Sequence, residues 1–243
     1  MSLPGDLVVG TLDRITAQTG VAEVEGEGGG PLLRLSGVGG GGRAGSVRLF
    51  EGGGLTRLVY CNLDLPQRDL DSHMLYGFGP ADSGVPHFTV DAADARGVVA
   101  FHVDLMPRVD LATHGPYLDA IFSPLDDVFA EVAGDPAFAA ARLTPKQRAL
   151  MSPWMLANRL DRSDFGRTGV PVRRYVDWWL TLVANGVGPE IEAGLADTDL
   201  PTRDAAMRRT LFGGDIDPAW DMAAAAVGSE PIQILRDLLV GSG

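Results

Sequence analysis

The sequence predicts an α+β fold with a mainly antiparallel sheet, and two observations support this prediction. Strand-like segments fill residues 46–105, whereas helix-like segments fill residues 115–243. The candidate strands come in consecutive pairs joined by short turns, and such hairpins build antiparallel sheets. Strands followed by helices are typical of domains in which the helices pack on the sheet.

One domain is expected from a chain of 243 residues with 45% hydrophobic content. Residues 1–45 would contribute a helix and a glycine-rich segment, residues 46–105 most of the sheet, and residues 115–243 most of the helices. Charged residues make up 21% of the chain without a long block of one sign, which argues against disorder.

The first 45 residues are predicted to contain an amphipathic helix over residues 5–18, followed by two glycine-rich turns. Four apolar residues recur there at helical spacing: Val8, Val9, Leu12 and Ile15. The glycine-rich segments, residues 26–30 and 37–45, lack the Lys-Ser/Thr ending of a phosphate-binding loop. We therefore expect them to be flexible turns or a hairpin loop.

Four strands are predicted, in two hairpins: residues 46–51, 55–62, 86–92 and 97–104. The connections "EGGGL" and "ADARG" have the length and residue types of hairpin turns. The segment between the hairpins, residues 63–85, is polar and punctuated by Gly and Pro. We predict that it is a long loop, and loops of this length often cover a functional site.

Helices are predicted in the remaining chain from apolar spacing and from Pro and Gly at their ends. Thr144 is a suitable N-cap before Pro145, and Pro124 and Pro153 are expected to interrupt their helices. The predicted helical segments are residues 115–134, 144–160, 171–186, 201–212, 217–227 and 231–240.

The charge and cysteine content exclude several classes of function. A net charge of −12 without a basic stripe disfavours binding to nucleic acid or to an anionic membrane. The lone Cys61 allows neither an intrachain disulfide nor a thiolate metal cluster. The segment "MSLPGDLVVG" does not resemble a signal peptide, and no run of apolar residues has membrane-spanning length, so we expect a cytoplasmic protein.

The hairpin of residues 86–106 carries the most informative polar pattern. On its first strand His87, Thr89 and Asp91 share one face, whereas Phe88 and Val90 share the other. On its second strand His102 and Asp104 share a face. This polar face has two interpretations: a solvated outer surface, or the floor of a pocket with a carboxyl group placed for proton transfer.

Other catalytic motifs are not found. The four histidines form no His-x-x-x-His pair, so a metal site is not favoured. The sequence has no Gly-x-Ser-x-Gly elbow and no Gly-x-Gly-x-x-Gly between a strand and a helix. A hydrolase elbow and a nicotinamide or flavin site of the Rossmann type are therefore not expected.

Three stretches, in this order, carry a family resemblance. They are "PHFTVDAADARGVVAFHVDLMPRVDLATHGPYLDAIF", "LTPKQRALMSPWMLANRL" and "DLPTRDAAMRRTLFGGDIDPAW". Together they resemble the ferredoxin-dependent bilin reductases, and more closely the red chlorophyll catabolite reductases. The resemblance implies a three-layer α/β/α sandwich that holds a linear tetrapyrrole between the central sheet and the C-terminal helices. It also implies single electrons from external ferredoxin and no cofactor bound to the protein.

The resemblance also implies roles for particular residues. Asp91 falls where the family places its catalytic acid. Asp204 is the best counterpart of a second family acid, with Asp199 as the fallback. Tyr60 falls near a His that one bilin reductase branch uses in a proton relay, and that His is missing here.

A proton donor at Asp91 needs a raised pKa, because an unperturbed Asp, with a pKa of about 3.9, is only about 0.1% protonated at pH 7. We expect burial among Phe88, Phe101 and Met106 to supply that shift. Residues expected to bind the substrate are His87, Tyr60, Phe88, His102, Met106 and Arg108.

Charged partners of the substrate and of the electron donor are predicted from the arginines. Arg108 and Arg57 are expected to pair with propionate carboxylates. An acidic ferredoxin would need a basic surface, which we expect at residues 159–174. The five arginines of that segment are Arg159, Arg162, Arg167, Arg173 and Arg174.

Two alternatives remain open from the sequence. The first is an isomerase or cyclase that uses the same fold and acids without electron input. The second is a non-catalytic protein that binds a hydrophobic small molecule. The fold alone does not decide between them.

Overall fold

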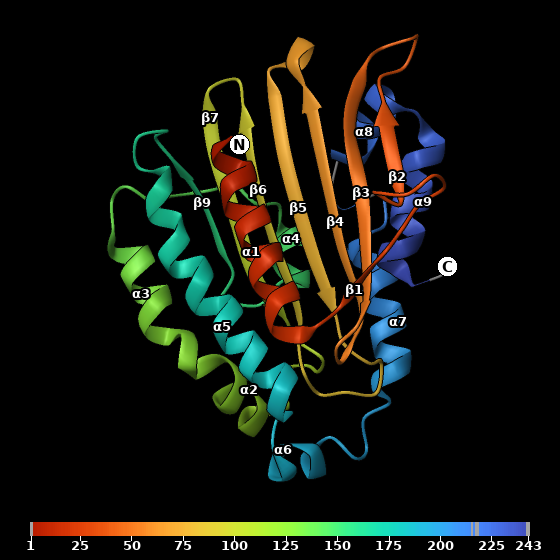
Figure 1. The fold of residues 1–243 in the computed structure, drawn as a ribbon. Helices are drawn as coiled ribbons and strands as arrows, with labels where there is room; N and C mark the ends of the chain where they lie inside the picture. The colour runs from red at the N-terminus through yellow and green to blue at the C-terminus, as the bar shows by residue number, and fades with distance from the viewer. Residues whose placement is uncertain (1, 215, 217–218, 242–243) are drawn as a thin grey trace.

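A central antiparallel sheet lies between two layers of helices in the computed structural model (Figure 1), which describes residues 2–214, 216 and 219–241. Within these residues the sheet has nine strands, in the order β1-β3-β4-β5-β6-β7-β9-β8, with β2 paired to β3. The strands are β1 Ala22–Val24, β2 Leu33–Ser36, β3 Arg43–Gly52, β4 Leu55–Leu65, β5 Leu70–Phe78, β6 His87–Ala95, β7 Val98–Met106, β8 Ala139–Ala140 and β9 Leu156–Leu160. The predicted α+β class and its three layers are confirmed.

One face of the sheet is covered mainly by α1 and α5, and Figure 1 shows both in front of the strands. The helices of this layer are α1 Leu3–Thr19, α2 Gly115–Phe122, α3 Asp126–Gly134 and α5 Gly169–Asn185. The short helix α6, Pro189–Gly194, lies at one end of the sheet. The 3-10 turns are η1 Pro66–Arg68, η2 Ser123–Leu125 and η3 Phe165–Thr168.

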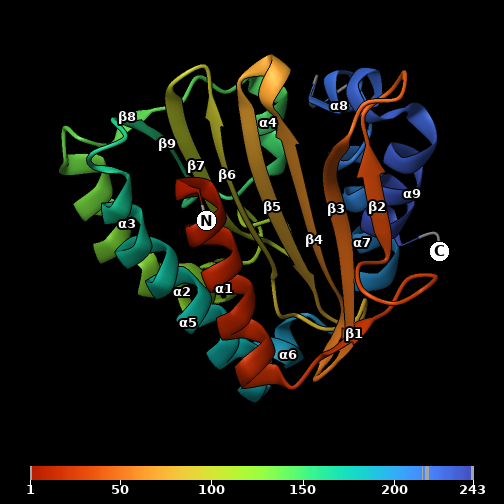
Figure 2. The same ribbon diagram turned by 45° about the horizontal axis from the view of Figure 1, so that its top comes forward.

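The opposite face carries the C-terminal helices and α4, and Figure 2 shows them on the far side of the strands from α1. Their bounds are α4 Pro145–Leu150, α7 Leu200–Leu211, α8 Ala219–Val227 and α9 Ser229–Val240. The apolar side chains accordingly form two clusters, one under α1 and α5 and one under α7–α9. No described helix has both the length and the apolar composition needed to cross a membrane.

Close packing of α5 on the sheet depends on Gly77 in β5. A Cβ atom at this position would lie 2.6 Å from the ring of Trp179. That ring stacks on Phe88 with 5.1 Å between the ring centroids, and its Nε1 donates to the carbonyl of Pro86 at 2.9 Å. Alternation along β6 therefore places Phe88 against α5, on the face opposite Asp91.

Two sequence predictions of secondary structure are wrong. Residues 63–85 are not one long loop, because β5 occupies residues 70–78 and pairs with β4 and β6. Its mixed sequence "LDSHMLYGF" hid the strand, since both of its faces combine polar and apolar residues. The predicted helix over residues 144–160 ends at Leu150, and residues 156–160 form β9 instead, paired with β7.

The remaining helices agree with the predictions to within a few residues. The opening helix extends from Leu3 to Thr19, and Pro124 separates α2 from α3 as expected. Thr144 caps α4 by accepting a hydrogen bond from the backbone N–H of Gln147 at 3.2 Å. Of the predicted segment 217–227, residues 217 and 218 lie outside the described residues.

Candidate functional site

Two adjoining hollows lie against the sheet on its α7–α9 face. The smaller, of about 260 Å³, contains Asp91 and His102, and the larger, of about 1020 Å³, extends toward the η1 turn and α8. They share three lining residues, Tyr76, Ala93 and Trp220. An elongated ligand could therefore contact both hollows.

Asp91 and His102 form a hydrogen-bonded pair in the smaller hollow. They are direct partners across β6 and β7, and their side chains point to the same face because both strands alternate. Nδ1 of His102 lies 2.7 Å from Oδ2 of Asp91. The Asp91 side chain is 37% exposed and the His102 side chain 13%. The pair is thus open to a ligand but partly shielded from water.

The walls of this smaller hollow are largely apolar and come from distant parts of the chain. Tyr76 lies on β5, and its ring meets that of Phe212 edge-on with 5.2 Å between centroids. The other wall residues include Phe101, Met151, Met155, Leu211, Ile216 and Trp220. The sequence prediction missed these walls except Phe101, because the strand containing Tyr76 was assigned to a loop and the methionines to a helix.

The larger hollow has an apolar floor and two arginines in its lining. The apolar residues include Leu63, Leu65, Leu70, Met74, Ile232 and Leu235. Arg68 donates to the carbonyl of Met222 at 3.1 Å, and Arg96 lies at the tip of the β6–β7 hairpin with φ of 53°. Both guanidinium groups are suited to bind carboxylates, because they present planar arrays of N–H donors.

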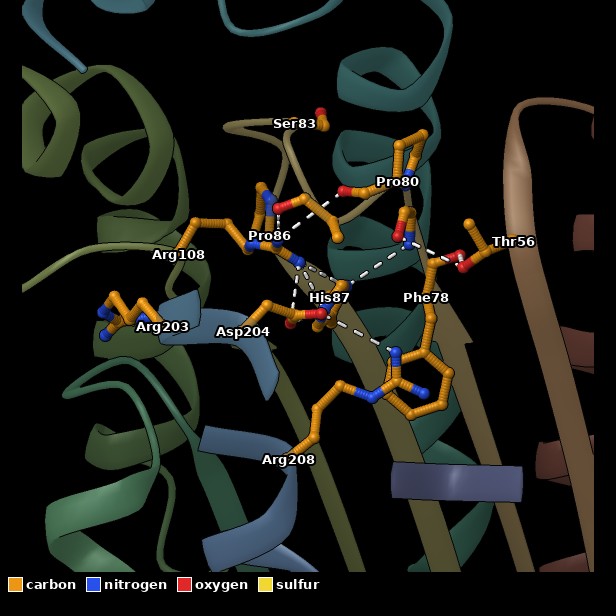
Figure 3. Close-up of polar contacts among 12 residues, drawn as sticks. Thr56, Phe78, Pro80, Ser83, Pro86, His87, Arg108, Arg203, Asp204 and Arg208 are labelled. Carbon is orange, nitrogen blue, oxygen red and sulfur yellow. Dashed lines mark hydrogen bonds and ion pairs between the residues drawn. The ribbon is translucent and has the colours of Figure 1, made fainter. Parts of the chain in front are cut away.

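A buried polar cluster, shown in Figure 3, lies farther along the same face of β6. Nε2 of His87 lies 2.7 Å from Oδ1 of Asp204, which also lies 3.1 Å from Nη1 of Arg108. Arg208 contributes a further positive charge, with Nη1 3.7 Å from Oδ2 of Asp204 and its guanidinium over the ring of Phe78. This cluster joins β6 to α7.

The protonation states within this cluster follow from its burial. Burial lowers the pKa of His87 to about 4, against the opposing effect of the Asp204 hydrogen bond. Nδ1 of His87 accepts from the backbone N–H of Gly79 at 3.3 Å, which favours the tautomer that carries its proton on Nε2 and donates it to Asp204. Nη1 of Arg108 also contacts the imidazole. Burial alone would raise the pKa of Asp204, but the hydrogen bond from His87 and the nearby arginines hold it below its ordinary value.

The structure separates several residues that the sequence prediction placed in one pocket. Asp204 lines neither hollow, and its partner His87 precedes Asp91 by four residues, a separation of about 13 Å along a strand. His87 and Arg108 are fully or almost fully buried in the polar cluster. Only His102 of the predicted substrate-binding residues shares the hollow of Asp91.

The predicted positions of Tyr60 and Phe88 need correction, because both lie on the α1–α5 face. Tyr60 belongs to the apolar cluster under α1, and its hydroxyl lies 2.7 Å from Nδ1 of His73. The residue of β5 that faces Asp91 is Met74. Met106 lies on the correct face but is fully buried and lines neither hollow.

The expected burial of Asp91 among three apolar residues is also wrong. Phe88 lies behind the sheet and Met106 is remote. Phe101 borders the hollow of Asp91, but its ring packs on Phe138 in the cluster under α1 and α5. Arg57 donates to the carbonyl of Leu238 at 3.0 Å and lines neither hollow. Among the residues that the structure describes, no group of three His, Cys, Asp or Glu is arranged to hold a metal ion.

Comparison with solved structures shows which known fold this chain is similar to. A crystal structure of phytochromobilin synthase from tomato, in complex with biliverdin, superposes with a TM-score of 0.77. The chain has the fold of that enzyme. The alignment covers 97% of this chain and 82% of phytochromobilin synthase, with 14% sequence identity. No family model matches the sequence, and no curated protein is significantly similar to it.

Proposed function

We propose that the protein reduces a linear tetrapyrrole or a similar conjugated pigment, with Asp91 as the principal proton donor. One observation carries the proposal: the Asp91–His102 pair opens into an apolar hollow under the C-terminal helices. In a fold shared with an enzyme crystallised with biliverdin, this hollow is a suitable place for a pigment.

The shape and lining of the hollows suit a flat, extended ligand. Pockets for small molecules commonly measure about 300–1,000 Å³ and combine apolar walls with a few placed polar groups. Tyr76, Phe212 and Trp220 offer aromatic surface to a conjugated ring system. Asp91 and His102 are the polar groups at one end, and Arg68 and Arg96 are those at the other.

The propionate groups of such a pigment would bind Arg68 and Arg96. This replaces the expectation of Arg57 and Arg108, neither of which lines a hollow. The two guanidinium groups belong to turns at one edge of the larger hollow, and the backbone N–H of Arg96 donates to the carbonyl of Asp69 beside Arg68 at 2.8 Å. Charge-assisted hydrogen bonds at this edge would fix the direction in which the pigment enters.

Reduction of one carbon–carbon double bond consumes two electrons and two protons. In the proposal the electrons arrive singly from an external ferredoxin-type donor. Asp91 gives the first proton to the pigment, His102 returns a proton to Asp91 through their 2.7 Å hydrogen bond, and Asp91 gives this proton to the pigment as the second. His102 then regains a proton from solvent water. A bound pigment would cover the exposed part of Asp91 and so favour its neutral, proton-donating form.

Asp204 has a supporting role in this proposal. Its hydrogen bond with His87 anchors α7 to β6, and its ion pair with Arg108 anchors α7 to the segment that follows β7. The last residues of α7 and its cap, Leu211 and Phe212, form a wall of the Asp91 hollow. Asp204 would therefore hold that wall in place.

The donor surface is proposed at a different position from the one expected from the sequence. Of the five arginines in residues 159–174, three form ion pairs: Arg162 with Asp94, Arg167 with Asp135, and Arg174 with Glu131. Four exposed cations without an ion pair in the described structure lie beside the Asp91 hollow, and only Arg159 among them belongs to the expected segment. They are Arg142, Lys146, Arg148 and Arg159. An acidic donor would be attracted to this cationic edge in spite of the net charge of −12.

The proposal is tested with purified protein, a panel of linear tetrapyrroles, and reduced ferredoxin under an oxygen scavenger. The panel contains biliverdin. It also contains red chlorophyll catabolite, because the sequence resembles the reductases of that compound. A change in the pigment's absorption spectrum that requires both protein and donor is expected. The proposal is wrong if no pigment of the panel is converted with either ferredoxin or a chemical one-electron reductant.

A non-redox isomerase is the second candidate. The Asp91–His102 pair favours it, because an acid hydrogen-bonded to an imidazole can move a proton between two carbons without a reductant. Conversion of a pigment by the protein alone would identify this activity. Binding without conversion under any condition would instead identify a pigment-binding protein.

A further inference from the structure

Asp104 is a buried carboxylic acid that the proposed function does not use. It lies on β7, is completely buried, and shares the face of His102 two residues earlier in the strand. No Arg, Lys or His nitrogen of the described residues comes within ion-pair distance of it. Its two oxygens accept from one residue, at 2.5 Å from the hydroxyl of Ser152 and at 2.9 Å from its backbone N–H.

The surroundings of Asp104 contain few other polar groups. Across the strand pair its partner is Thr89, whose buried hydroxyl has no hydrogen-bond partner within the described residues. Asp91 and His102 lie farther along the same face, and the His87–Asp204–Arg108 cluster lies in the other direction. The negative charge of Asp104 also contributes to the raised pKa of the Tyr175 phenol, on α5. Arg148 lines an exposed hollow beside Ser152.

We propose that Asp104 is a positioning residue whose negative charge keeps a proton on the imidazole of His102 and so supplies protons to Asp91. Two residues on one face of a strand lie about 7 Å apart, too far for a hydrogen bond but close enough for electrostatic attraction in a buried setting. A carboxylate at that distance stabilises imidazolium relative to neutral imidazole.

Asp104 carries its negative charge at neutral pH, but a moderate fall in pH neutralises it. Burial raises its pKa to about 6, and the Ser152 hydrogen bonds and the nearby His102 oppose the rise. The group is therefore mostly ionised at pH 7 and becomes neutral below about pH 6. Ser152 holds the ionised form, which gives a physical role to the Ser-Pro step of the sequence "LMSPWM".

The proposal is tested first without any pigment, by an NMR titration of the imidazoles. The chain has four histidines, and His102→Gln identifies the His102 signal by its loss. Asp104→Asn keeps the shape and removes the charge, and we expect it to lower the titration midpoint of His102 by about one pH unit. Thr89→Val is the matched control, since it changes the neighbour of Asp104 without changing a charge, and it should leave the midpoint in place.

A second variant guards against misfolding of Asp104→Asn. Ser152→Ala removes one hydrogen bond from the carboxylate, which should shift the loss of the Asp104 charge to higher pH and lower the His102 midpoint in the same direction. A His102 midpoint that stays unchanged in a folded Asp104→Asn or in Ser152→Ala would overturn the proposal. A shift of equal size in Thr89→Val would also overturn it, because it would show a packing effect rather than an effect of charge.

The consequence for turnover rests on the proposed reductase function and is measured separately. With wild-type activity established, Asp104→Asn should lower kcat about tenfold at pH 7, leave KM for the pigment unchanged, and shift the acid limb of the pH profile. If no variant and no wild-type protein converts a pigment, the reductase proposal fails while the NMR result still decides the role of Asp104. An unchanged kcat and pH profile in an active Asp104→Asn would refute its role in proton supply.

Discussion

Asp91 and His102 face each other across adjacent antiparallel strands, 2.7 Å apart, at the floor of a hollow under the C-terminal helices. The pair combines two groups that exchange a proton with a position that a ligand can reach. Behind it, four residues along β6, a buried cluster of opposite charges anchors α7. The pair and the cluster are separate parts of the molecule, and we expect the first to serve chemistry and the second to serve stability.

Asp204→Asn should destabilise the protein by about 3–5 kcal/mol, because it leaves Arg108 and Arg208 buried without a counter-charge. Urea unfolding at pH 7 measures this effect. Asp199→Asn is the control, since Asp199 caps α7 from the surface and Asn caps a helix about as well, so the free energy of unfolding should change little. Equal effects of the two variants would show that the buried charges do not matter for stability.

His87 should make the protein less stable as the pH falls from about 6.5 to 4. Its pKa in the folded protein is about 4, below that of the unfolded chain, so the unfolded state binds the proton more readily. The contribution of the neutral His87 to the free energy of unfolding is fully present above the unfolded pKa. It decreases by about 3 kcal/mol as the pH falls toward the folded pKa.

The measurement compares the free energy of unfolding of wild type and His87→Gln between pH 7 and pH 4. The wild type should lose up to about 3 kcal/mol more than the variant over this interval. Asp104 contributes in the opposite direction, since its raised pKa favours the folded state at low pH, but that contribution cancels in the comparison. Parallel pH curves would contradict the assignment of His87 as a neutral buried imidazole.

Arg68→Ala and Arg96→Ala should each weaken pigment binding about tenfold, if each guanidinium binds one carboxylate. Absorption titration with biliverdin measures the binding. Arg43→Ala, at an exposed position outside both hollows, is the matched control. With the dimethyl ester of the pigment the two variants should bind as the wild type does, and a loss that persists with the ester would remove the carboxylate interpretation.

Reversal of charge on the cationic edge should impair only the reaction driven by an acidic protein donor. Lys146→Glu combined with Arg159→Glu is expected to raise KM for ferredoxin about tenfold or more at low salt, because the attraction becomes a repulsion. Turnover driven by a small chemical reductant should stay unchanged. Arg174→Glu is the control, because Arg174 lies on α5 on the opposite face of the sheet and forms an ion pair with Glu131. If this control raises KM for ferredoxin by the same factor, the donor does not dock at the cationic edge.

The α+β class and the shared face of Asp91 and His102 could be predicted from the sequence, because alternation and turn residues act locally, whereas the three layers were implied by the family resemblance. Asp91 and His102 were placed on one face correctly by parity. The same parity places Phe88 on the other face, so its predicted role near Asp91 contradicted the pattern from which the strand was inferred. Local alternation decides the face of a strand, but it does not show what covers that face.

Features that depend on distant segments could not be predicted in the same way. Arg68 and Arg96 meet at one hollow only because η1 and the β6–β7 turn lie at the same edge of the sheet. β5 was missed because a central strand with polar groups on both faces has no clear period. The pairing of Asp204 with His87 joins residues 117 positions apart, so its position in a buried cluster emerges only from the packing of α7 on β6.

Single-turnover reduction by Asp91→Asn tests the central claim most directly. The variant and the wild type are loaded with the same pigment, reduced anaerobically, and followed by absorption. We expect Asp91→Asn to bind the pigment with unchanged affinity, to accept an electron, and to form the protonated product at least about a hundredfold more slowly. Product formation at the wild-type rate would contradict the account, because it would show that the proton comes from another group.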